Sequence, residues 1–160
     1  MAEAADIETA TGPDNITVHG SAVAWKDRGL LITGDSGSGK TALAVELIAL
    51  GAGLVADDWV LVERGRAAGL VMSPPAPIAG LVELRGVGLI RLAYTDQAPL
   101  MCIVDLNREP DARLPTPQQR TLLGIHCPVI AGKGMDRLAS ALMAVMRAGG
   151  LLDPNFFAKP

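Results

Sequence analysis

Residues 30–41 read LLITGDSGSGKT, a short aliphatic stretch that runs into a glycine-rich segment ending in lysine and threonine. Residues 34–41 match the pattern G-x-x-x-x-G-K-[ST], which is typical of a phosphate-binding loop between a strand and a helix. Glycine tolerates backbone torsions that other residues avoid, so successive N–H groups of such a loop can face one concavity. The stretch predicts a strand over 30–33, an anion-binding loop, and a helix from Lys40 to about Leu50.

The side chains at the end of this loop predict nucleotide chemistry. The ammonium of Lys40 can approach the β- and γ-phosphates, and the hydroxyl of Thr41 can bind Mg²⁺. We therefore expect a nucleoside triphosphate, or an equivalent phosphate ligand, together with Mg²⁺ at this segment. The expected nucleotide-binding residues are Gly34, Asp35, Ser36, Gly37, Ser38, Gly39, Lys40 and Thr41.

Two adjacent acids, Asp57 and Asp58, follow the buried-strand pattern at 54–56. Beside a phosphate loop, one carboxylate can hold Mg²⁺ and the other can accept the proton of an attacking hydroxyl. A solvated turn at the end of a strand is the alternative interpretation. Glu83, within the apolar run 81–84, needs a partner or a metal if it is buried, whereas alternation along a strand would face it to water. His19 alone indicates no chemistry.

Composition limits the class of protein. The chain has 160 residues, 49% of them hydrophobic, which suits one folded domain and excludes global disorder. Its net charge of −3 argues against non-specific nucleic-acid binding. Cys102 and Cys127 lack metal-ligand spacing and suit a reducing compartment. With no signal-peptide pattern and no run long enough to insert into a membrane, the sequence predicts a cytoplasmic protein.

Short strand patterns outnumber helical ones, so we expect an α/β domain built on a mixed sheet with few helices rather than a doubly wound sheet. Residues 1–14 are expected to be a disordered tail, followed by a single domain over 15–160. The small gap between the first two strands favours an antiparallel hairpin. Expected strands cover 16–25, 30–33, 54–56, 60–62, 70–72, 81–84, 89–92, 101–106 and 127–130; a long loop covers 107–120 and a second helix 135–147.

Four segments together resemble the C-terminal catalytic domain of bacterial HPr kinase/phosphorylase, in the short form of the alphaproteobacterial type. They read VHG at 18–20, LITGDSGSGK at 31–40, LVADD at 54–58 and LRGVGLI at 84–90. The resemblance covers about residues 16–92 and continues more weakly to 130.

The resemblance implies a fold related to phosphoenolpyruvate carboxykinase and a homo-oligomer. It implies ATP- and Mg²⁺-dependent phosphorylation of a serine on the phosphocarrier HPr, and the reverse removal of that phosphate by phosphorolysis. His19 matches an active-site histidine, Lys40 the loop lysine and Asp58 an acid/base aspartate. The candidate metal ligands are Thr41 and Glu83, which match magnesium positions, and Asp57 beside the catalytic acid.

The sequence departs from the family pattern at several positions. Thr41 stands where serine is usual and Ala42 where glutamate is usual, and Lys133 lies between two glycines where the family has an arginine. Two other functions stay open: a nucleotide-binding regulator without transfer that works with a membrane sensor kinase, or a kinase of another hydroxyl substrate.

Overall fold

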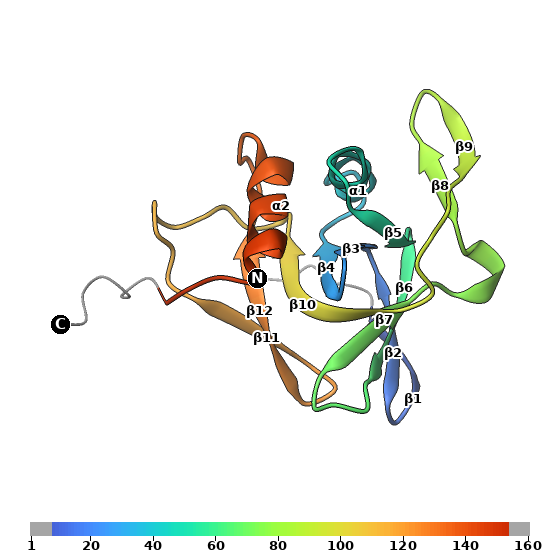
Figure 1. Cartoon of the computed structure of the whole chain (residues 1–160), viewed down its shortest axis with the longest axis horizontal. Coiled ribbons are helices and arrows are strands. Elements are labelled where there is room, and N and C mark those ends of the chain that lie inside the picture. Colours follow the sequence, from blue (N-terminus) through green and yellow to red (C-terminus); the bar gives the residue numbers. More distant parts are fainter. Residues whose placement is uncertain (1–7, 154–160) are drawn as a thin grey trace.

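The computed structural model describes residues 8–153 and shows one large curled sheet with two α-helices over one face (Figure 1). The large sheet has ten strands: eight follow the path β1-β2-β6-β7-β10-β4-β3-β5, β12 pairs with β10, and β11 pairs with β12. A separate two-stranded sheet is formed by β8 and β9. The strands are β1 Glu8–Gly12, β2 Asn15–His19, β3 Ser21–Trp25, β4 Arg28–Thr33, β5 Gly53–Ala56, β6 Trp59–Arg64, β7 Leu70–Ser73, β8 Leu81–Leu84, β9 Gly88–Arg91, β10 Ala98–Asp105, β11 Gln118–Leu122 and β12 Ile125–Ala131; the helices are α1 Lys40–Ala49, the 3-10 turn η1 Ala76–Ile78, and α2 Leu138–Ala148.

Strand β10 joins an antiparallel half of the large sheet to a mixed half. Its first residues, Ala98 and Pro99, pair antiparallel with β7. The register shifts between Leu100 and Cys102, and the rest of the strand pairs in parallel with both β4 and β12. The mixed sheet with few helices predicted from the sequence is thereby confirmed.

Each face of this sheet buries its own apolar core. Leu30 and Ile32 of β4 lie in the cluster that α1 and α2 cover, whereas Leu31 between them belongs to the cluster on the opposite face. This is the period of two expected for a strand covered on both sides. Helices α1 and α2 lie side by side over the helix-covered face, with Leu47 and Leu142 fully buried (Figure 1).

The predicted hairpin before the glycine-rich loop is confirmed by β3 and β4, and the predicted helix from Lys40 by α1. The single strand predicted over 16–25 is wrong, because the structure has two strands there, β2 and β3, with Gly20 between them. The N–H of Gly20 donates to the carbonyl of Asp58 at 3.1 Å. A Cβ at Gly20 would lie 2.6 Å from the carbonyl oxygen of Ile32, so the close approach of the two backbones requires glycine.

Three other expectations differ from the structure. Part of the expected tail, Glu8–Gly12, forms β1 against β2, while residues 1–7 lie outside the described residues. The end of the expected loop over 107–120 is the start of β11, which pairs with β12. Helix α2 begins only at Leu138, because Arg137 before it has a φ of +56° and interrupts the helical pattern.

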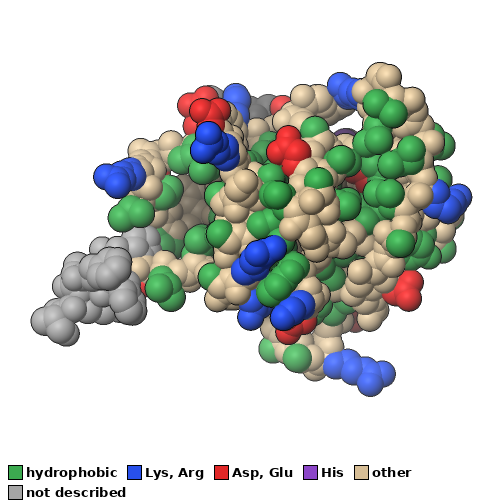
Figure 2. Space-filling view, turned by 45° about the horizontal axis from the view of Figure 1, so that its top comes forward, with side chains coloured by type: hydrophobic (Ala, Val, Ile, Leu, Met, Phe, Trp, Pro, Cys, Tyr) green, Lys and Arg blue, Asp and Glu red, His purple; other side chains and the backbone are tan. Residues whose placement is uncertain are grey.

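The surface is partly apolar. Figure 2 shows apolar side chains gathered toward the right of the face in view and several lysine and arginine side chains close together near its lower middle. On the β8–β9 hairpin, Val87 is 79% and Leu89 66% exposed. None of the helices formed within residues 8–153 has the length and hydropathy needed to cross a bilayer.

Candidate active site

The glycine-rich segment lies between β4 and α1, as the sequence predicts. Gly34, Gly37 and Gly39 have φ values of +149°, +82° and +98°, which favour glycine. A Cβ at Gly34 would also lie 2.6 Å from Ser38 Oγ. Helix α1 starts directly after Gly39, so the positive end of its dipole lies at the loop. The loop therefore has the backbone conformation and the helix terminus that an anion-binding loop needs.

Lys40 lies across this loop. Its side chain is directed back toward the loop, and Nζ donates to the carbonyl oxygens of Gly34 at 2.8 Å and Asp35 at 2.9 Å. The residue is only 8% exposed. The ammonium is thus held next to the glycine-rich segment, where a phosphate oxygen could replace a carbonyl as its acceptor.

Asp57 ties the end of β5 to the first turn of α1. One of its carboxylate oxygens, Oδ1, accepts a hydrogen bond from Thr41 Oγ1 at 2.9 Å and another from Ser21 Oγ at 2.6 Å. Asp57 is 7% exposed. Sequence reasoning brought Asp57 and Thr41 to this site and missed Ser21. The signal for Ser21 was a hydroxyl in an otherwise apolar strand.

Asp58, the next residue, points elsewhere. Its side chain is 69% exposed, and Oδ1 lies 3.2 Å from His19 Nε2. Its φ of +69° is unusual for a residue with a side chain. This turn lets the two adjacent carboxylates take different partners. The pairing of β2 with β6 sets His19 opposite Trp59 and so brings the histidine to Asp58.

Glu83 lies on the β8–β9 hairpin, and its role as a metal ligand stays a prediction from the sequence. It is exposed on β8, which belongs to the separate two-stranded sheet. In the stretch from residue 8 to 153, no group of three acidic, histidine or cysteine side chains is arranged to hold a metal ion. The same hairpin does approach the loop, because a Cβ at Gly37 would lie 4.0 Å from Arg85 Nη1.

Sequence reasoning missed a polar cluster at the carboxyl end of β10. Asp105 is 3% exposed, and its Oδ2 lies 3.1 Å from Arg120 Nη2 and 3.4 Å from Arg108 Nε. Arg120 also donates to Thr33 Oγ1 at 3.3 Å, directly before the glycine-rich loop. Asn107 bonds to Asp35 within the loop. Since β4 and β10 are parallel neighbours, polar residues at their carboxyl ends meet at one edge, which was the available signal.

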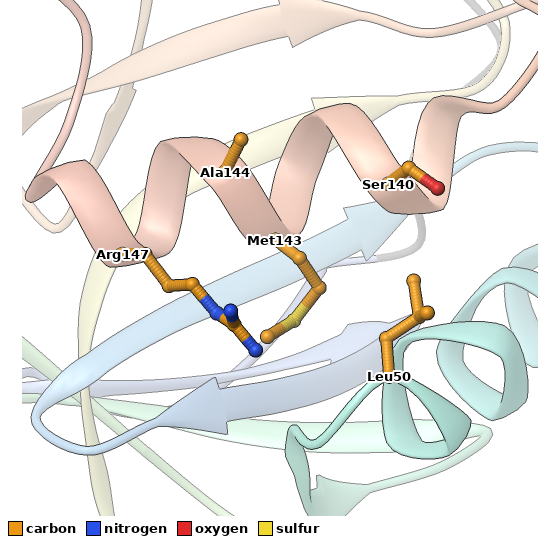
Figure 3. Close-up of a pocket in the computed structure, with 5 residues that line it drawn as sticks. All are labelled: Leu50, Ser140, Met143, Ala144 and Arg147. Carbon is orange, nitrogen blue, oxygen red and sulfur yellow. The ribbon is translucent and has the colours of Figure 1, made fainter.

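A shallow depression of about 260 Å³ lies at the other end of α1 (Figure 3). Leu50 from the end of α1 faces Met143 and Arg147 of α2 across it. The ten residues of α1 separate this depression from Lys40, a length of about 15 Å along the helix. Its lining has no carboxylate, and it is separate from the site at the loop.

The side chains at the loop fit a nucleotide phosphate with Mg²⁺. The hydroxyl of Thr41 and the carboxylate of Asp57 are oxygen donors, the type that Mg²⁺ selects. Mg²⁺ is usually held by one or two protein groups together with substrate phosphates and water, so a cage of three acids is not required. Ser38 Oγ is buried without a hydrogen-bond partner in the described part of the chain, which leaves a polar atom of the loop unsatisfied.

Comparison with known proteins places the chain in a family. The family model described as HPr Serine kinase C-terminal domain matches residues 13–96. The HPr kinase/phosphorylase of Azoarcus sp. is 36% identical, over 80% of this chain and 47% of the relative. That of Burkholderia lata is 36% identical over 78% and 44%. The chain thus spans about half the length of these relatives.

The fold agrees with this match. The structure of the Hpr(Ser) kinase/phosphatase from Coxiella burnetii superposes with a TM-score of 0.72 and 25% identity, covering 82% of this chain and 94% of that one. The curled mixed sheet with two α-helices among the described residues is therefore the fold of that protein. From its sequence and its fold alike, the chain belongs to the family of the HPr serine kinase C-terminal domain.

Proposed function

We propose that this chain is an ATP- and Mg²⁺-dependent protein kinase that phosphorylates a serine of HPr. The observation that carries the proposal is that two adjacent carboxylates, Asp57 and Asp58, have different surroundings and different hydrogen-bond partners. Asp57 is buried against the hydroxyl of Thr41, whereas Asp58 is exposed and bonded to His19. Relatives named HPr kinase/phosphorylase support HPr as the substrate.

Thr41 and Asp57 are the residues proposed to hold the metal. Their oxygens lie 2.9 Å apart, already oriented toward each other by a hydrogen bond. When bound, Mg²⁺ would neutralise part of the charge on the phosphate oxygens. Ser21 keeps the Asp57 carboxylate in place by its own hydrogen bond of 2.6 Å. The carboxylate of Glu83, on the β8 strand that packs near α1, is proposed as a further ligand of the metal, as the family resemblance implies.

Asp58 is proposed to act on the substrate. Its exposed carboxylate would accept the proton of the serine hydroxyl while the serine oxygen forms a bond to the γ-phosphorus and the bond from that phosphorus to ADP breaks. His19 holds one carboxylate oxygen at 3.2 Å, which leaves the other for the substrate. Lys40 would exchange a loop carbonyl for a phosphate oxygen.

We also propose that the same site carries out phosphorolysis of phosphoserine. The segment 84–90 resembles a stretch linked to dephosphorylation, and its Arg85 lies beside the loop, with Nη1 4.0 Å from where a Cβ on Gly37 would be. A guanidinium at this place could hold inorganic phosphate. The second word of the relatives' name, phosphorylase, is consistent with this activity.

The test is an assay with the purified chain, HPr from the same organism and Mg-ATP. Phosphoserine on HPr, detected by mass spectrometry and absent when the target serine is alanine, is the expected result. Inorganic phosphate added in excess should then remove it and release pyrophosphate. Tight ATP binding without transfer would instead indicate a regulator, and transfer only to other hydroxyl compounds would indicate a different kinase.

A further inference from the structure

The peptide unit between Gly34 and Asp35 is held from both of its sides. Its carbonyl oxygen, on Gly34, accepts the 2.8 Å hydrogen bond from Lys40 Nζ. Its N–H, on Asp35, donates to Asn107 Oδ1 at 2.9 Å. In a trans peptide these two groups point in opposite directions, so fixing the N–H also fixes where the carbonyl points.

Asn107 is itself firmly placed. Its side-chain nitrogen donates to Asp35 Oδ1 at 3.2 Å, so the amide group makes two hydrogen bonds to one residue of the loop. Its backbone N–H donates to Asp105 Oδ1 at 2.9 Å. Asp105 is buried and paired with Arg120 through its other oxygen. The chain of contacts therefore runs from the buried end of β10 to the glycine-rich loop.

We propose that Asn107 is a positioning residue that sets the location of the Lys40 ammonium through the Gly34–Asp35 peptide. The glycine at position 34 makes this control necessary, because glycine leaves its adjoining peptide units more freedom to rotate than any other residue does. Without the side chain of Asn107, the carbonyl of Gly34 loses its fixed direction and the ammonium loses a fixed acceptor. The consequence for catalysis rests on the proposed function, whereas the effect on Lys40 itself does not.

Amine labelling of the nucleotide-free protein measures the effect on Lys40 directly. Brief treatment with acetic anhydride followed by mass spectrometry gives the acetylation rate at each lysine. Lys26 and Lys133 are exposed and serve as internal references. In Asn107→Ala, acetylation of Lys40 relative to these references should rise about 5- to 10-fold, which corresponds to the loss of one hydrogen bond.

Two further variants distinguish a specific effect of Asn107 on Lys40 from a general loosening of the surrounding structure. Gln118→Ala removes the 2.9 Å bond from Arg108 in the same region and should leave the labelling of Lys40 at the parental rate. The exchanged pair Asp35→Asn with Asn107→Asp keeps an acceptor for the N–H of residue 35 and reverses the donor and acceptor of the side-chain bond. It should return Lys40 labelling to within about twofold of the parent, since both hydrogen bonds can form again.

A nucleotide titration connects the inference to function. The Kd for Mg-ATP should weaken about 5- to 10-fold in Asn107→Ala and stay at the parental value in Gln118→Ala. Parental Lys40 labelling in Asn107→Ala, an equal rise in Gln118→Ala, or no recovery in the exchanged pair would each overturn the inference. If the parent itself binds no Mg-ATP, the proposed function fails, and the labelling comparison still decides the role of Asn107.

Discussion

The hydroxyl of Thr41 donates a 2.9 Å hydrogen bond to Asp57 Oδ1 and so connects the first turn of α1 with the end of β5. The two residues are separated by 16 positions and belong to different elements. Because Ser21 from β3 donates to the same oxygen, three segments converge on one buried carboxylate.

Replacing Thr41 tests the proposed metal site. Thr41→Val removes the hydroxyl and keeps the shape, so the affinity for Mg-ATP should fall about 10-fold, since one oxygen ligand and its hydrogen bond are lost. The affinity for ATP measured in EDTA should change much less. Thr41→Ser, which keeps the hydroxyl, is the matched control. Equal losses with and without Mg²⁺ would show that Thr41 does not serve the metal.

Replacing Asp58 tests the proposed proton acceptor. Asp58→Asn should lower the rate of phosphate transfer to HPr by about 10²- to 10⁴-fold, the usual contribution of a general base, and leave the Kd for Mg-ATP nearly unchanged. Asparagine is chosen because it tolerates the φ of +69° found at this position. Retained transfer would mean that the hydroxyl proton leaves by another route.

A methyl group at Gly20 should destabilise the fold. In Gly20→Ala the new Cβ would lie 2.6 Å from the carbonyl oxygen of Ile32, so backbone must shift. We expect a loss of about 2–3 kcal/mol in the free energy of unfolding, as for other overpacked sites, measured by urea denaturation. Gly69→Ala is the control, because its Cβ would meet nothing closer than 4.0 Å. Similar losses in both variants would contradict the steric explanation.

The buried carboxylate of Asp105 should depend on Arg120. Arg120→Met leaves Asp105 with the more distant Arg108 and the N–H of Asn107, and we expect a loss of about 3 kcal/mol, because an under-compensated buried charge is costly. The double variant Asp105→Asn with Arg120→Met should be more stable than Arg120→Met by about 1 kcal/mol or more, since the orphaned charge is gone. A double variant no more stable than the single one would assign the loss to packing instead.

The cysteines should make the fold sensitive to alkaline pH. Burial, with a smaller contribution from Cys127, raises the pKa of the Cys102 thiol from 9.0 to about 12. Burial also raises the pKa of Cys127. Above pH 9 the unfolded chain releases these protons and the folded chain keeps them, so the free energy of unfolding should be unaffected below pH 9 and fall as pH rises toward 12.

Urea denaturation at a series of pH values measures this effect. Each thiol with a raised pKa should lower the free energy of unfolding by up to about 1.4 kcal/mol per pH unit, between its pKa in the unfolded chain and its pKa in the folded chain. Cys102→Ala should show a shallower decline than the parent between pH 9 and pH 11. Identical slopes in the two proteins would mean that the alkaline loss arises from other groups.

Local sequence patterns were sufficient for much of the fold. The hairpin of β3 and β4, the start of α1 at Lys40 and the positive φ values of the loop glycines all follow from neighbouring residues, because torsional preferences and short hydrogen bonds act over a few positions. The strand β11 was not predictable in this way. Its residues Gln118–Leu122 are mostly polar and become a strand only through pairing with β12.

The sequence alone determined that a glycine-rich loop precedes a helix and that two acids follow a nearby strand, because each of these is a contiguous segment with a strong local preference. Only the tertiary structure decided that Asp57 turns inward to Thr41 while Asp58 turns outward to His19, and that Asn107 holds the loop. These contacts join positions 16 to 72 apart in the chain. Their geometry depends on strand pairing and backbone turns that no single segment specifies.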